Sequence, residues 1–230
     1  MIKLNPVPFA AFVVLAFAQP ALAQNLVTNP GFENPALAPG VATTNSIPGW
    51  TGSTSNCCDY GVGDGSGVLS APEGENWGYN NDLGTRAISQ QTSEAVVAGA
   101  TYTLSAQFGQ RTDNVAYTGR LELWAGGAAA NGNVPGGTLV GFVEVASVSG
   151  AFVPASLTYT PLPGDPAVGQ LLSVRLTRAT PAGQTNYDDV SLTAVSPPAI
   201  PTLTEWAMML FAMLLALGAA VHLNRRRLLG

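Results

Sequence analysis

Residues 101–108 read TYTLSAQF, and this stretch decides the fold class. Tyr102, Leu104, Ala106 and Phe108 are apolar, whereas the residues between them are Thr, Ser or Gln. A period of two residues places the apolar side chains on one face of a β-strand and the polar side chains on the other. The stretch therefore predicts a strand that is buried on one side.

The same alternation recurs along the chain, and turns rich in Gly and Pro separate its occurrences. Predicted strands cover residues 86–91, 120–124, 138–145, 157–159, 172–177 and 190–193. Pro135–Gly136–Gly137 and Pro163–Gly164–Asp165–Pro166 are typical turn sequences between them. Before residue 200 no segment has a sustained helical period. Many short strands separated by turns predict an all-β sandwich.

Two apolar segments flank this region. At the N-terminus, Lys3 precedes an apolar run from Val7 to Ala18, and Ala21 with Ala23 forms an A-x-A site. This pattern predicts a signal peptide over residues 1–23, removed after Ala23. At the C-terminus, Trp206 to Leu223 is apolar except for His222, and three arginines, Arg225, Arg226 and Arg227, follow shortly after it.

The C-terminal segment has the length and flanks of a membrane-spanning helix. Its 18 residues would extend about 27 Å as a helix, close to the roughly 30 Å of a bilayer core. Thr202 and Glu205 are spaced as a capping box, and Trp206 suits the membrane interface. The arginines favour a cytoplasmic end, which places the residues before 200 outside the cytoplasm.

This tail resembles the IPTL-CTERM sorting signal of Gram-negative bacteria. The resemblance rests on Ile200, Pro201, Thr202, Leu203, Glu205 and Trp206, then the apolar helix, then the arginines, in that order. It divides the end of the chain into a linker and motif (196–205), a transmembrane helix (206–224) and a basic end (225–230). It implies recognition by an exosortase-like enzyme, removal of the tail, and transit through the inner membrane to the cell surface or the extracellular space.

The region between the two ends, residues 24–199, has an acidic balance. It holds five Arg, no Lys and thirteen Asp or Glu, which gives a net charge of 5 − 13 = −8. Such a surface repels nucleic acid, so we expect no nucleic-acid partner. Without His or Lys in this region, mechanisms that use a Ser–His or Cys–His pair or a catalytic Lys are excluded. Catalysis by a carboxylate pair, as in glycosidases, remains open.

The same region resembles the galactose-binding-like jelly rolls, which include many carbohydrate-binding modules. The matching segments are NLVTNPGFE (25–33), IPGWT (47–51), AISQQT (87–92), ATYTLSAQFGQR (100–111) and NYDDVSLT (186–193). The resemblance implies a jelly-roll β-sandwich over residues 24–195. It says little about the ligand, because this fold carries many functions.

A structural calcium ion is the first candidate site. Asp188 has the same strand parity as Val190 and Leu192, so we expect it to point into the core, where a carboxylate must be paired, hydrogen-bonded or bound to a metal. Related jelly rolls often hold Ca²⁺ between the first and last strands. By this resemblance Glu33 and Asp188 are the matching ligands, with Asn29 and Asp189 as further candidates; a capping or amide-accepting role for Asp188 is the alternative.

Aromatic residues give the second candidate site. Residues 57–79 read as a glycine-rich functional loop, in which Trp77 and Tyr79 would share one face if the backbone were extended. With Tyr60 they are candidates for stacking on a sugar, and burial at one end of the sandwich is the alternative. The adjacent Cys57 and Cys58 leave open a strained vicinal disulfide, two free thiols or intermolecular bridges.

These observations favour a non-catalytic surface or extracellular-matrix protein that is delivered by its tail. A carbohydrate-binding module that partners a glycan or extracellular polysaccharide is the first alternative. A carboxylate-based glycoside-active enzyme is the second.

Overall fold

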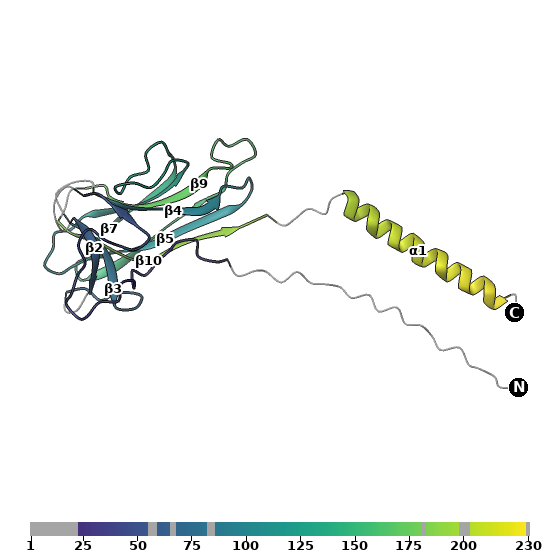
Figure 1. Cartoon of the computed structure of the whole chain (residues 1–230), viewed down its shortest axis with the longest axis horizontal. Helices are drawn as coiled ribbons and strands as arrows, with labels where there is room; N and C mark the ends of the chain where they lie inside the picture. The colour runs from purple at the N-terminus through teal and green to yellow at the C-terminus, as the bar shows by residue number, and fades with distance from the viewer. Residues whose placement is uncertain are drawn as a thin grey trace, which may run out of the picture.

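The computed structural model describes residues 23–54, 59–64, 68–81, 86–180, 183–197 and 203–228. They form a β-sandwich followed by one helix, α1 (Leu203–Leu228) (Figure 1). The strands are β1 (Thr51–Gly52), β2 (Tyr60–Asp64), β3 (Asn76–Asn80), β4 (Ile88–Ala95), β5 (Thr101–Gln110), β6 (Thr118–Ala125), β7 (Thr138–Ala146), β8 (Ala151–Tyr159), β9 (Leu171–Arg178) and β10 (Thr185–Val195).

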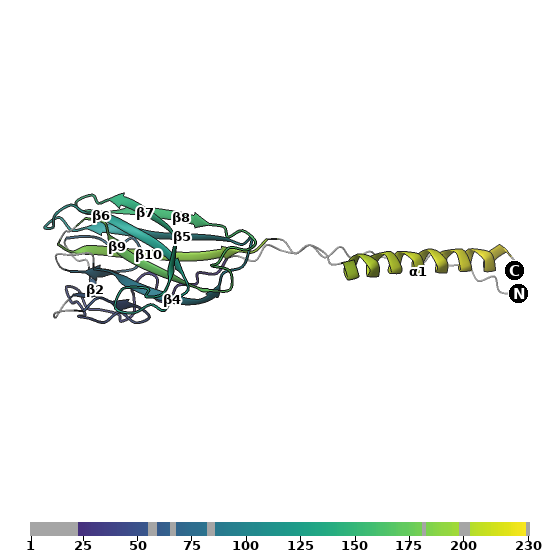
Figure 2. The same ribbon diagram turned by 90° about the horizontal axis from the view of Figure 1, so that it is seen from above.

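Two five-stranded antiparallel sheets pack face to face, as Figure 2 shows from above. One sheet has the order β1-β4-β9-β6-β7, and the other has the order β2-β3-β10-β5-β8. Strands adjacent in a sheet are distant in the sequence, as in β10, which pairs with both β3 and β5. The jelly-roll β-sandwich predicted from the sequence is confirmed.

The core lies between the sheets and follows the alternation of the sequence. Tyr102, Leu104, Ala106 and Phe108 of β5 all lie in the main hydrophobic cluster, with Leu121, Leu123, Leu172, Val174 and Leu176 of the opposite sheet. The polar residues between those of β5 are only partly buried, on the outer face. The prediction from residues 101–108 is therefore confirmed.

The glycine-rich stretch before Tyr79 is not only a loop, because it contributes β2 and β3. Gly63 and Gly78 let aromatic rings rest directly on these strands. A Cβ at Gly63 would come within 2.8 Å of the Trp77 ring, and one at Gly78 within 2.7 Å of the Phe32 ring. Glycine within a strand here marks close approach of another group.

A bulge in β10 corrects the predicted orientation of Asp188. Tyr187 pairs with Phe108 of the core, so Asp188, paired with Gln107, points to the outer face of the sheet. The register shifts before Ser191, and Asp189 has a φ of 47°. Because a bulge adds a residue, parity with Val190 does not carry back to Asp188. The inward orientation predicted from the sequence is wrong.

Several predicted features lie outside the described residues: residues 1–22 of the signal peptide, Cys57, Cys58, Ile200, Pro201 and Thr202. The helix α1 begins at Leu203, and its side chains from Trp206 to Arg226, including Arg225 and Arg226, are exposed. Trp206–Arg226 has a mean hydropathy of 2.0 and is long and apolar enough to cross a membrane.

Candidate functional site

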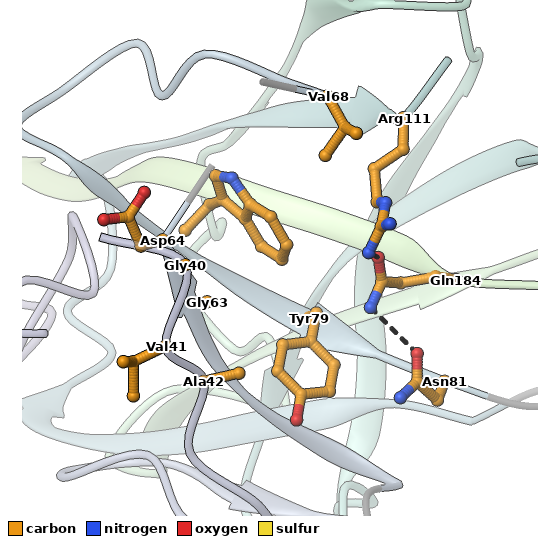
Figure 3. A pocket seen from close by; sticks show the side chains of 11 residues that line it. Gly40, Val41, Ala42, Gly63, Asp64, Val68, Tyr79, Asn81, Arg111 and Gln184 are labelled. Atoms are coloured by element: carbon orange, nitrogen blue, oxygen red, sulfur yellow. Dashed lines mark hydrogen bonds between the residues drawn. The ribbon is translucent and has the colours of Figure 1, made fainter. Parts of the chain in front are cut away.

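The outer face of the β2-β3-β10-β5-β8 sheet carries a pocket of about 360 Å³ at the end where β10 begins (Figure 3). Segments that are far apart in the sequence meet there. The lining residues are Gly40, Val41, Ala42, Gly63, Asp64, Val68, Trp77, Tyr79, Asn81, Arg111 and Gln184.

Trp77 and Tyr79 supply the aromatic part of the pocket. They are two residues apart in β3 and face outward, because Gly78 between them pairs with the core residue Tyr187. Their rings meet edge to face, with centroids 6.1 Å apart and an interplanar angle of 75°. The Tyr79 hydroxyl donates to the Thr43 carbonyl at 2.5 Å, which fixes that ring. The predicted shared face is therefore present.

A hydrogen-bonded chain forms a polar side of the same pocket. Arg111 donates from Nε and Nη2 to both carboxylate oxygens of Asp113, at 2.9 and 2.7 Å, and from Nη1 to Gln184 at 3.1 Å. Gln184 in turn donates to Asn81 at 2.9 Å, as Figure 3 shows. Asp64 lies toward the opposite side of the pocket. A planar side chain held at this many points is pre-positioned for ligand contact.

Asp188 lies beside this pocket on the same outer face. The antiparallel register that pairs Gly78 with Tyr187 brings Asp188 next to Trp77 across the β3–β10 pair. Its carboxylate is fully buried and accepts backbone N–H groups from Glu73 at 3.0 Å and Asp189 at 2.7 Å. Burial raises the pKa of Asp188 to about 7, although both amide donors oppose the rise.

Glu33 and Asp188, the two main predicted calcium ligands, both contact the loop before β3 but accept hydrogen bonds from different backbone N–H groups. Glu33 accepts the backbone N–H groups of Glu75 at 2.9 Å and Asn76 at 2.8 Å, and Asp188 accepts that of Glu73. Within the described segments, no three His, Cys, Asp or Glu side chains are arranged to hold a metal ion. We therefore derive no chemistry through a metal, and calcium binding stays a prediction.

The two further calcium candidates have other surroundings. Asn29 closes a turn, accepting the Asn34 N–H at 3.0 Å and donating to the carbonyls of Asn34 and Pro48. Asp189 is exposed on the bulge of β10. The side-chain amide of Asn29 is thus engaged within its own turn, and calcium binding by Asn29 or Asp189 stays a prediction.

Stability should depend on pH through Asp188. Its folded-state pKa lies above the roughly 3.9 of an unfolded carboxyl group, so the folded state binds the proton more tightly. This contribution is fully present below about pH 4 and is lost as the pH rises toward 7. We expect urea titrations to show the free energy of unfolding falling over this window by more in the wild type than in Asp188→Asn.

A calcium titration in the same experiment tests the predicted metal site. An ion bound by the ionised Asp188 carboxylate would stabilise the folded state by mass action and raise Tm at pH 7. Adding a chelator should then lower Tm in the wild type but not in Asp188→Asn. A wild-type Tm that is the same with calcium and after thorough chelation contradicts the prediction.

Tyr60, the third predicted sugar contact, does not belong to the pocket. Its ring belongs to the core cluster, and a Cβ at Gly52 would lie 2.3 Å from it. The inward face of Tyr60 follows from its place in β2, where Tyr60 pairs with Asn80 and Val62 pairs with Gly78. Of the three predicted residues, Trp77 and Tyr79 line the pocket, but they are only 3% and 4% exposed, as the alternative of burial predicts.

The residues that sequence reasoning missed are those of the polar side, above all Gln184 and Asn81. It also missed the surroundings of Arg175 and Arg178. Arg178 is fully buried, and Arg175 donates to Glu122 at 2.9 Å on the outer face of the other sheet. For Arg175 the sequence did offer a signal. β6 and β9 carry alternating charges, and oppositely charged side chains on neighbouring strands tend to pair.

Comparison with known proteins identifies the relatives of this chain. Residues 23–193 match the family model HpiC1-like, described as HpiC1 cyclase, and residues 198–227 match the IPTL-CTERM motif. No curated protein matches the chain. The tail therefore carries the signature of processing by an exosortase-like enzyme, and with the apolar helix it indicates transit through a membrane.

Solved structures with the same fold come from Fischerella sp. TAU. A Stig cyclase, Fisc, in complex with (3Z)-3-(1-methyl-2-pyrrolidinylidene)-3H-indole is 23% identical with a TM-score of 0.65, covering 76% of this chain and 99% of that one. A cyclase in complex with 4-(1H-indol-3-yl)butan-2-one is 22% identical with a TM-score of 0.66, covering 78% of this chain and 100% of that one.

These matches correct two expectations from the sequence. The domain matches a cyclase family over residues 23–193, and not specifically the galactose-binding modules. The expectation of a non-catalytic matrix or glycan-binding protein is overturned by the same match. The physical error was to consider only a carboxylate pair for catalysis once His and Lys were absent, whereas proton transfer needs only one suitable carboxyl group.

Proposed function

Because the chain belongs to the HpiC1-like family of cyclases, we propose that its β-sandwich closes a ring in a small aromatic substrate held against Trp77 and Tyr79. The observation that carries this proposal is the aromatic pocket on the outer face with a buried carboxyl group, Asp188, beside it. A pocket of about 360 Å³ suits a small molecule, since ligand pockets usually measure about 300–1,000 Å³.

Asp188 is the group that we assign as general acid. A protonated carboxyl group can deliver its proton to an electron-rich carbon of the substrate, which leaves a cation. Asp188 lies on the face that carries Trp77, and burial raises its pKa to about 7, so a substantial fraction is protonated near neutral pH. A general acid must lie within hydrogen-bond distance of the atom that it protonates. The segment of Glu73 covers Asp188, so this segment must open as the substrate enters.

The aromatic rings have a second task in this scheme. Once protonated, the substrate cation is stabilised by the faces of Trp77 and Tyr79 through cation–π attraction. A double bond elsewhere in the substrate attacks the cationic carbon and forms the new carbon–carbon bond. The resulting cation then loses a proton, which restores the protonated carboxyl group. One proton is gained and one lost, so substrate and product are isomers.

The compounds in the two Fischerella cyclase complexes indicate which class of substrate to test first. Both contain an indole or indole-derived ring system, which is flat and can pack on Trp77. We therefore propose indole-bearing substrates for this chain. The polar chain of Arg111, Gln184 and Asn81 would face the substituent of the ring.

Binding of 4-(1H-indol-3-yl)butan-2-one should depend on Trp77. Loss of an aromatic contact of this kind costs about 1.4 kcal/mol or more, so Trp77→Leu should weaken Kd about tenfold in calorimetric titrations. Trp124→Leu is the matched control, because Trp124 lies on β6 of the other sheet and donates to Glu122. Equal affinities of wild type and Trp77→Leu would move the site elsewhere.

The finer destination of the protein is also a proposal. We infer that the signal peptide of residues 1–23 and the tail are both removed, and that the cyclase domain acts at the cell surface or outside the cell. The IPTL-CTERM match supports this route. Recovery of a mature protein that still carries Trp206 to Arg227 would contradict removal of the tail.

A further inference from the structure

Exposed apolar side chains gather at the end of the sandwich where the chain leaves for α1. Val97, Leu162, Val168 and Val195 have exposed fractions of 47%, 72%, 38% and 62%. They come from the β4–β5 turn, the β8–β9 loop and the last residue of β10. We call these four residues the tether end.

Hydrogen bonds show that these segments are neighbours. Gly99 donates to the Pro161 carbonyl at 2.8 Å, and Gly169 donates to Val96 at 2.8 Å, which joins the β4–β5 turn to the β8–β9 loop. Val195 pairs with Thr101, whose hydroxyl lies 3.0 Å from that of Thr160. The tether end is therefore one surface and not four scattered side chains.

Few charges interrupt this surface. Within residues 93–101, 160–171 and 193–197, Glu94 and Asp165 are the charged side chains, and no Arg or Lys occurs there. Asp165 accepts hydrogen bonds from the Tyr159 hydroxyl at 3.0 Å and the Ala167 N–H at 2.9 Å, so its carboxylate is already engaged. The contact chemistry of the tether end is therefore apolar.

The short connection between β10 and α1 indicates which partner the tether end contacts. α1 begins at Leu203, eight residues after Val195, and eight residues span at most about 28 Å. Because α1 is long and apolar enough to cross a membrane, the tether end is confined close to the bilayer surface. Such confinement raises the effective concentration of weak apolar contacts.

We propose that the tether end rests on the surface of the membrane that α1 enters, as long as the tail is attached. The pocket then opens away from the bilayer, because its residue Gln184 precedes β10 and Val195 ends it. Eleven residues of strand separate the two by about 35 Å. Substrate would reach the pocket from the aqueous side.

Lipid quenching in the full chain tests this orientation. Leu162→Cys and, as the matched control, Val115→Cys are each placed in a Cys57→Ser/Cys58→Ser background, since Val115 is 61% exposed in the β5–β6 loop next to the pocket. Each protein carries an environment-sensitive dye and is reconstituted in phosphatidylcholine vesicles containing spin-labelled lipid.

We expect the dye at residue 162 to be quenched at least about twofold more than the dye at residue 115, and Val97→Glu to reduce that difference because it places a charge on the apolar surface. The unsubstituted background, without an added cysteine, checks for stray labelling. Equal quenching at the two positions, or no quenching at either, overturns the proposal.

Discussion

Asp188→Asn should lower kcat/KM for cyclisation by about 10²- to 10⁴-fold, the usual contribution of a positioned acid or base. Asparagine keeps the size of the side chain and can still accept a backbone N–H, but it cannot give up a proton as a carboxyl group does. Asparagine therefore keeps an acceptor for one of the two N–H groups, of Glu73 and Asp189, that bond to residue 188, while the acid is removed. Chromatography with mass detection of the cyclised isomer gives the rates.

Glu144→Gln is the control for this substitution. Glu144 lies on β7 of the other sheet, where its carboxylate pairs with Arg120 at 2.9 Å and is 40% exposed, so its loss should leave kcat/KM unchanged. The Tm of Asp188→Asn at pH 7 shows whether a loss of activity comes from unfolding, because the variant can be assayed well below its own Tm. Wild-type activity in folded Asp188→Asn would contradict the assigned acid.

Phe32→Ala should destabilise the domain by about 3–5 kcal/mol, the cost of emptying a well-packed phenylalanine site. The Phe32 ring is fully buried, lies over Gly78 of β3, and has its centroid 5.5 Å from that of Trp50. It joins the N-terminal segment to the sheet, where Leu26 donates to Leu192 and Val190 donates to Pro30. Urea unfolding followed by circular dichroism measures the loss.

Phe142→Ala is the matched control for Phe32→Ala. The Phe142 ring is 51% exposed, and its main partner is the Arg120 guanidinium, 3.8 Å from the ring centroid. A contact of this kind at an exposed site contributes about 0.5–1 kcal/mol. If the two substitutions cost the same, the N-terminal segment is not part of the cooperative fold.

The fold was largely predictable, and the exceptions have a physical cause. Strands such as β5 have a clear period of two residues, because one face meets the core and the other meets water. β2 and β3 were hidden by Gly61, Gly63 and Gly78, which usually indicate loops. Here the missing side chains make room for aromatic rings, and only the three-dimensional packing shows this.

The site was predictable only in part. The spacing of Trp77 and Tyr79 predicted their shared face, because that depends on local backbone geometry alone. Their polar neighbours Arg111, Gln184 and Asn81 come from three separate segments, and no local pattern joins them. The orientation of Asp188 failed for another reason: a single bulge reverses strand parity.

The same limit explains the wrong inference about catalysis. Thirteen acidic residues between positions 24 and 199 look alike in the sequence, and none carries a catalytic motif. Burial under the segment of Glu73 is what raises the pKa of Asp188 to about 7. That burial arises because segments distant in the sequence meet in the folded domain, and the amino-acid composition does not show this.

Cyclisation of an indole-bearing substrate in D₂O tests the central claim most directly. If Asp188 passes an exchangeable proton to carbon, the wild type should form a cyclised isomer that carries one deuterium, and Asp188→Asn should form it far more slowly. A folded wild-type domain that yields no cyclised isomer from any indole-bearing substrate, or an isomer without deuterium, would contradict the account.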